Sequence, residues 1–103
     1  MKIFKIYTES EEFGESAYQD AERILKEFNF EEVQQHMQRV GWTWSTREGD
    51  RVPSIEELHA CAQDLLRRLI FSEEPIYRIG TGGFQAVQFP WGIELFFVIQ
   101  GAR

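Results

Sequence analysis

The last quarter of the chain, residues 76–100, constrains the fold more than any other stretch. It contains three runs rich in β-branched and aromatic residues, separated by two short turn sequences: IYRIGTGGFQAVQFPWGIELFFVIQ. Gly82-Gly83 can form a type I′ turn, because glycine adopts positive φ at both central positions without steric cost. This turn predicts a hairpin in which Thr81 lies opposite Phe84. We therefore expect a three-stranded antiparallel meander.

The second turn sets which side chains share a face of this meander. Pro90-Trp91-Gly92 is typical of a three-residue loop, since proline presets φ and Gly92 can take the left-handed position that closes a bulge. The loop predicts that Phe89 lies opposite Ile93. Because successive side chains of a strand alternate, this register gives two apolar faces: Ile76, Val87, Phe89, Ile93, Leu95, Phe97 and Ile99 on one, and Tyr77, Ile79, Phe84, Ala86, Phe96 and Val98 on the other. A sheet with one face in water alternates apolar with polar residues, so we expect both faces to be covered, by helices or by another chain.

Upstream of the meander, the chain shows one strand pattern and three helix patterns. Residues 2–8 alternate as a short strand, which we expect at an edge of the sheet. Apolar residues at helical spacing predict helices over about 17–28, 30–40 and 55–70, each preceded by a capping box: Ser16 with Gln19, Asn29 with Glu32, and Ser54 with Glu57. Residues 42–53 are expected to form one long irregular segment. The sequence therefore predicts a single α+β domain over residues 1–103, in the order β-α-α-α-β-β-β, with the helices packed on the sheet.

Composition limits the function classes. An apolar fraction of 43% with nine phenylalanines argues against disorder. The one cysteine, Cys61, excludes an internal disulfide and fits a reducing compartment, and no stretch has the length of a membrane span or the pattern of a signal peptide, so we expect a cytoplasmic protein. A net charge of −6 disfavours direct nucleic-acid binding. The first 35 residues carry nine acids and four bases, which indicates either solvated helix faces or an acidic surface that meets a partner.

Candidate catalytic and metal-binding residues have structural explanations. His59, Cys61 and Asp64 are close in sequence, but positions i and i+2 of a helix point about 200° apart. Two histidines and one cysteine give no spacing typical of a zinc site. Adjacent glutamates such as Glu31-Glu32 and Glu56-Glu57 fall at helix starts, where the helix dipole favours negative charge. We therefore expect no catalytic residue, no metal and no cofactor.

Two segments remain as candidate binding elements. The turn at Gly80–Gly83 can be compared with a phosphate-binding loop, but such loops precede a helix, whereas this one precedes a strand. The segment Trp42–Arg51 combines tryptophan with arginine, a pairing that can stack on a ligand ring or anchor a protein partner. The indoles can instead cap the core under a long loop. The candidate binding residues are Trp42, Trp44, Arg47, Arg51, Thr81 and Gly82.

Four motifs together resemble a series found in a group of small proteins encoded by bacteriophages and prophages, most of them uncharacterised. The resemblance covers about residues 29–100 and consists of GWTW from Gly41, VPSIEEL from Val52, TGGFQA from Thr81 and ELFFV from Glu94. It implies an early or accessory phage protein that modifies or blocks a host process. The group provides no functional residues to transfer to this chain.

Two functions follow as expectations. The first is a non-enzymatic interaction protein that binds a host macromolecule, such as a component of host defence or replication. The second is a small-ligand or nucleotide-signal binder that uses the Trp42–Arg51 loop and the Gly80–Gly83 turn. The three predicted helices are too short to cover both faces of the sheet, so we expect the second face to be buried in a homodimer or against a host protein.

Overall fold

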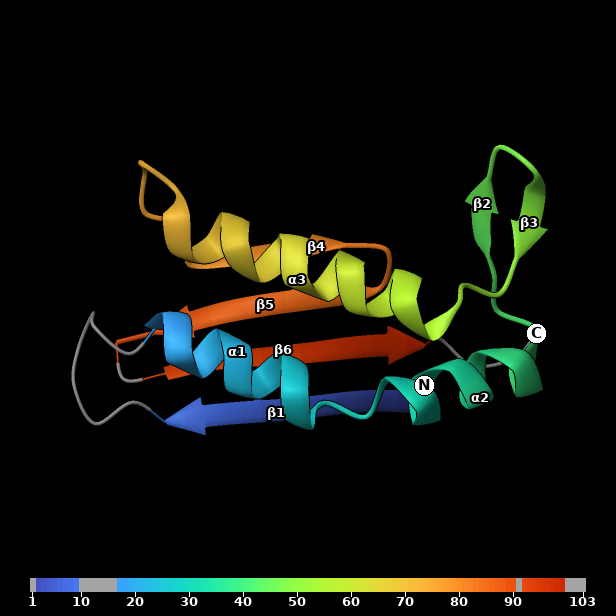
Figure 1. The fold of residues 1–103 in the computed structure, drawn as a ribbon, viewed down its shortest axis with the longest axis horizontal. Coiled ribbons are helices and arrows are strands. Elements are labelled where there is room, and N and C mark those ends of the chain that lie inside the picture. Colours follow the sequence, from blue (N-terminus) through green and yellow to red (C-terminus); the bar gives the residue numbers. More distant parts are fainter. Residues whose placement is uncertain (1, 10–16, 91, 100–103) are drawn as a thin grey trace.

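The computed structural model describes residues 2–9, 17–90 and 92–99, and it confirms the α+β class with an N-terminal strand, helices packed on a sheet and a C-terminal meander (Figure 1). Along the chain the elements are β1 (Lys2–Glu9), α1 (Ala17–Glu27), α2 (Phe30–Val40), β2 (Trp44–Thr46), β3 (Gly49–Arg51), α3 (Ile55–Phe71), β4 (Arg78–Thr81), β5 (Phe84–Phe89) and β6 (Gly92–Ile99).

Strands β1, β4, β5 and β6 form one antiparallel sheet, the main sheet, in the order β1-β6-β5-β4. The first strand lies at an edge, as predicted, and pairs along its full length with β6. The first hairpin also has the predicted register, with Thr81 opposite Phe84. Gly82 and Gly83 both have positive φ, 62° and 97°, as a type I′ turn requires.

The predicted register of the second hairpin is wrong by one residue. Phe89 pairs with Gly92 rather than with Ile93, so the connection contains two residues, of which Trp91 lies outside the described ones. Gly92 is not in the left-handed region. It is a strand residue at a close approach, since a Cβ there would collide with the carbonyl oxygen of Thr8 and lie 2.9 Å from the hydroxyl oxygen of Tyr7. A contact from a strand more than 80 residues away in sequence explains this glycine, and no local turn pattern could indicate it.

This one-residue difference changes which side chains share a face. The two predicted apolar faces are therefore wrong, because Phe84 and Ala86 lie on the same face as Leu95 and Phe97. These four side chains are fully buried under the helices. The described helices pack on this face alone: α1 lies against β1 and β6, and α3 against β4 and β5 (Figure 1). No helix among the described residues packs on the opposite face.

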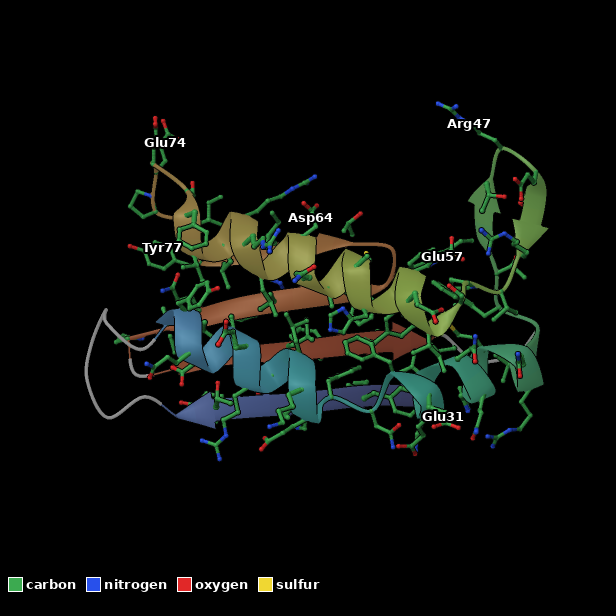
Figure 2. The ribbon with its side chains drawn as sticks, in the orientation of Figure 1. Glu31, Arg47, Glu57, Asp64, Glu74 and Tyr77 are labelled. Carbon is green, nitrogen blue, oxygen red and sulfur yellow. The ribbon has the colours of Figure 1, made fainter. Side chains whose placement is uncertain are left out.

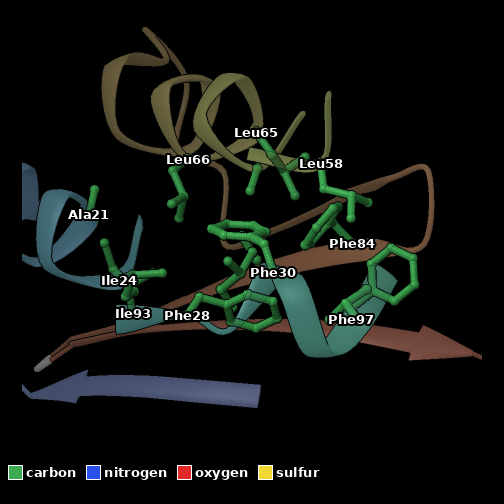
Figure 3. Packing of buried hydrophobic residues seen from close by; sticks show 14 of the residues in the cluster. Ala21, Ile24, Phe28, Phe30, Leu58, Leu65, Leu66, Phe84, Ile93 and Phe97 are labelled. Carbon is green, nitrogen blue, oxygen red and sulfur yellow. The ribbon is translucent and has the colours of Figure 1, made fainter. Parts of the chain in front are cut away.

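The core fills the space between the helices and this face of the sheet (Figure 3). Phe84 forms its centre, with ring centroids 4.6 Å from Phe97 and 6.0 Å from both Phe28 and Phe30. Leu58, Leu65 and Leu66 of α3 lie above these rings in Figure 3, and Ile24 of α1 lies to their left. Burying each such side chain is worth roughly 1.5–3 kcal/mol, so this layer dominates the stability of the fold.

The helix ends follow the predicted capping. Asn29 accepts a hydrogen bond from the backbone N–H of Glu32 at 3.0 Å. Ser54 and Glu57 form the full reciprocal capping box at the start of α3. At the end of α2, the N–H of Trp42 donates to the carbonyl oxygen of Met37 at 2.9 Å, closing the helix at Gly41. The remaining predicted capping box begins at Ser16, outside the described residues.

Residues 42–53 are more ordered than predicted. Instead of one irregular segment they contain a short hairpin, in which Trp44 pairs with Arg51 and Thr46 with Gly49. The chain order is therefore β-α-α-β-β-α-β-β-β. In Figure 1 the β2–β3 hairpin projects beyond the start of α3, away from the main sheet. Three-residue strands of mostly polar composition carry almost no periodic signal, which is why the sequence pattern missed them.

Candidate binding surface

The face of the main sheet opposite the helices is the largest candidate surface. We call it the open face. Register assigns to it side chains from all four strands: Ile3, Lys5, Tyr7, Arg78, Gln85, Val87, Phe89, Glu94, Phe96 and Val98. No described helix or hairpin packs on these side chains.

Apolar groups make up most of the open face. Ile3, Tyr7 and Phe89 retain 47%, 40% and 38% of their accessible surface, which is high for large apolar residues in a sheet. Phe96 and its neighbours on the central strands are half-buried by one another. Tyr7 and Phe89 meet edge to face across Gly92, with centroids 6.2 Å apart. The side chains on the sheet thus support each other laterally, and part of the surface of Ile3, Tyr7 and Phe89 stays accessible to solvent.

The charged groups on this face lie on both sides of Phe96. Lys5 is its direct cross-strand neighbour on β1. From the other side, the Arg78 guanidinium lies 5.9 Å from the Phe96 ring centroid, a cation–π distance. Arg78 Nε also donates to Oε1 of Gln85 at 3.1 Å, which fixes the guanidinium over the sheet. Glu94, next along β6, supplies the opposite charge between Tyr7 and Val87.

At one end, the apolar surface continues into a groove of about 480 Å³ between the end of α3 and the end of β5. Phe89 belongs to both the open face and this groove. Tyr77, which is 70% exposed, forms another wall, and Glu73 and Glu74 supply carboxylates at the rim. In Figure 2, Glu74 points outward from the loop that follows α3.

Four of the six predicted site residues do meet. The Trp44 indole N–H donates to the Gly82 carbonyl oxygen at 2.9 Å, and a Cβ on Gly82 would lie 3.1 Å from the same ring. Trp42 packs edge to face on Phe97 with centroids 5.5 Å apart. Thr81 lies beside them, its carbonyl oxygen 3.9 Å from the Cys61 sulfur. Both indoles are half-buried, and their contacts connect the β2–β3 hairpin to the glycine turn.

Of the other two predicted residues, Arg51 is the cross-strand neighbour of Trp44 but bonds to α3, and Arg47 lies apart from this cluster. Arg51 makes a two-pronged ion pair with Glu57, at 2.6 and 2.7 Å, which ties the β2–β3 hairpin to the start of α3. The pair with Arg51, together with the Ser54 N–H, lowers the pKa of the Glu57 carboxyl from 4.5 to about 2. Arg47 lies at the tip of the hairpin and points away from the body of the molecule (Figure 2).

The cysteine and the two histidines are placed as structural residues rather than as catalytic ones. Burial raises the pKa of the Cys61 thiol, which disfavours the nucleophilic thiolate. His59 contacts the Phe30 ring and His36 the Phe4 ring, both edge to face. Among the residues described, no three histidine, cysteine, aspartate or glutamate side chains are grouped as metal ligands. The helices that the structure describes are also too short or too polar to cross a membrane.

Comparisons with known proteins add no assignment: no family model, curated protein or solved structure matches the chain.

Sequence reasoning missed the charged residues of the open face. Lys5 was assigned only to an edge strand, and neither Arg78 nor Glu94 was a candidate. Strand alternation is the signal that could have found them. Arg78 aligns with Val87 in the first hairpin, whose register was predicted correctly, and Glu94 aligns with Val87 once the second hairpin has its two-residue connection.

Proposed function

We propose that this chain is a non-enzymatic phage accessory protein that acts by binding a host protein through the open face. The observation that carries the proposal is the exposed apolar sheet surface itself, opposite a complete helical layer. Monomeric proteins rarely leave large contiguous apolar patches in water, and such patches typically mark interaction sites. The phage context rests on the sequence resemblance alone.

The residue types of the open face support protein recognition. Aromatic and arginine side chains are the commonest energetic hot spots, and Phe96 with Arg78 stacked on it combines both near the centre of the sheet. Phe96 is already half-buried on the sheet, so completing its burial with a partner would contribute about 1 kcal/mol, roughly half of the value for an exposed phenylalanine. The matching partner surface is apolar at its centre, with a carboxylate placed for Lys5 or Arg78 and a donor for Glu94.

Charge distinguishes a protein partner from a nucleic acid. Phosphate backbones are bound by several cationic groups acting together. On the open face, Lys5 and Arg78 are offset by Glu94, and the chain as a whole carries −6. A mixed-charge apolar surface fits a folded protein, whose own surface mixes both signs, better than a uniformly negative polymer.

Two phenylalanine variants test the proposal. The tagged protein is used to capture partners from a bacterial host lysate, the captured protein is identified and purified, and its affinity is measured by calorimetry. Phe96→Ala should weaken binding by about 30-fold, the effect of losing roughly 2 kcal/mol at a hot spot. Phe71→Ala removes an equally large, 63% exposed ring from the helical side and should leave the affinity unchanged. Equal affinities for Phe96→Ala and the unmodified protein would contradict the proposal.

A further inference from the structure

The open face carries what a self-complementary interface needs: an apolar centre with both signs of charge beside it. We propose that, without another partner, two copies of this chain pack open face to open face as a two-fold symmetric dimer. This inference rests on the same surface as the proposed function. It adds that a second copy of the chain competes with the host protein for the open face.

The size of the open face fits a weak dimer. The strands of the sheet have eight, eight, six and four residues, each rising about 3.3 Å, and neighbouring strands lie about 4.8 Å apart. The sheet therefore offers about 400 Å² of flat area per copy, and two copies bury about 800 Å², to which the relief of the side chains adds. Interfaces of this size are typical of weak, transient complexes, so we expect a reversible dimer rather than a permanent one.

The charge pattern allows the face to pair with itself. In a two-fold interface the same patch meets itself, so each charge needs its opposite within that patch. Lys5 and Arg78 supply positive groups and Glu94 a negative one, all on the same face. Each Glu94 can therefore meet a basic side chain of the other copy, and the two Phe96 rings can share the apolar centre.

The net charge of the chain also favours this orientation. Exposed acids cluster on the helical side, including Glu31 and Glu32 at the start of α2 and Glu56 at the start of α3. Face-to-face packing places the two helical layers on opposite outer sides of the dimer. The two sheets alone separate them by about 10 Å, already more than the Debye length of about 8 Å at physiological salt. Repulsion between the acidic layers is therefore largely screened.

A direct consequence is competition. A host protein that binds the open face must displace the second copy, so its apparent affinity falls as the concentration of this chain rises. Self-association then holds the apolar surface out of water until the partner is present.

Sedimentation velocity with complementary charge-reversal variants tests this inference. The unmodified protein should change from a 12.2 kDa monomer to a dimer over about 1–300 µM, a range set by its small interface. Glu94→Lys leaves only positive charges among the described groups of the face, and Lys5→Glu with Arg78→Glu leaves only negative ones. Each variant alone should dimerise at least tenfold more weakly, and an equimolar mixture should associate at least as tightly as the unmodified protein. Glu48→Lys, the same charge change at the tip of the β2–β3 hairpin, is the matched control and should not alter dimerisation.

The outcomes separate the two proposals. A monomer throughout the concentration range, or variants that dimerise like the unmodified protein and gain nothing on mixing, would overturn the dimer. Neither result involves a host protein, so host binding would stand or fall by its own test. If Arg78→Glu prevents folding, Lys5→Glu alone replaces the double variant, because Lys5 lies at an exposed position on an edge strand. The mixing experiment with Glu94→Lys is then repeated with this single variant.

Discussion

Replacing Gly83 with alanine tests the packing at the point where the first hairpin, the tryptophan segment and the core meet. Gly83 has a φ of 97°, in the region that residues with a Cβ avoid. A Cβ at this position would also lie 2.7 Å from Cζ of Phe97 and 3.1 Å from the Trp42 ring. The Phe97 ring is fully buried, so it has no space into which to retreat.

Two costs add in this variant. The left-handed backbone costs a non-glycine residue about 1–2 kcal/mol. Overpacking against a buried ring costs a further 1–3 kcal/mol or so. Gly83→Ala should therefore lower the free energy of unfolding by about 2–5 kcal/mol, a large part of the roughly 5–15 kcal/mol expected for a domain of this length.

Urea denaturation followed by circular dichroism measures this loss, with Gly41→Ala as the matched control. Gly41 has a similar positive φ of 71°, but a Cβ there meets nothing within 4 Å, so only the backbone cost of about 1–2 kcal/mol remains. In a Phe97→Leu background, Gly83→Ala should also fall to about this smaller cost, because the collision is gone. Equal losses for Gly83→Ala and Gly41→Ala in the unmodified protein would refute the packing described at this turn.

Three further predictions concern the predicted site. Because the folded pKa of Glu57 is lowered to about 2, its contribution to stability is complete above pH 4.5 and is lost as the pH falls towards 2. Melting temperatures of the unmodified protein and Glu57→Gln should therefore differ at neutral pH and converge in acid; a constant difference would contradict the Arg51 pairing. Trp44→Phe keeps an aromatic ring but loses the N–H that donates to Gly82 and part of the indole that packs beside it, and urea denaturation should show a loss of at least about 0.5–1.5 kcal/mol. A thermal-shift screen against nucleotides should show no stabilisation, whereas a true ligand at 100-fold excess over its Kd would add about 2.7 kcal/mol and revive the small-ligand alternative.

Features that depend on neighbouring residues were predictable. Ser54 with Glu57 identified the start of α3, and Gly82-Gly83 identified both a turn and its register. In each case the physical cause lies within a few residues, in a cap that satisfies free N–H groups or in a backbone conformation that only glycine adopts easily.

Features that depend on distant contacts were not predictable. Gly92 looks like a turn residue in sequence, but it is a glycine because Thr8 and Tyr7 of β1 approach it closely. Treating it as a turn residue shifted β6 by one position and reversed its two faces relative to β5. Glu94 was missed for this reason.

The predicted tryptophan site was partly located. Trp44 and Gly82 were grouped as parts of one site, and they do touch. Arg47 was grouped with them because it follows closely in sequence, but the β2–β3 hairpin carries it to the far tip. Sequence proximity could not reveal a hairpin made of two three-residue strands.

The central claim is that one face of the sheet is core and that the other, which has no cover from the described residues, is free to bind a partner. Thiol labelling of adjacent positions on β5 tests it most directly, using Ala86→Cys and Val87→Cys in a Cys61→Ala background. At about 1 µM, the lower end of the expected dimerisation range, the cysteine at position 87 should react rapidly and the one at position 86 should be protected. At high protein concentration, position 87 should become protected as well. Protection of both positions at the lowest concentration would mean that the chain covers its own second face, and this result would contradict the account.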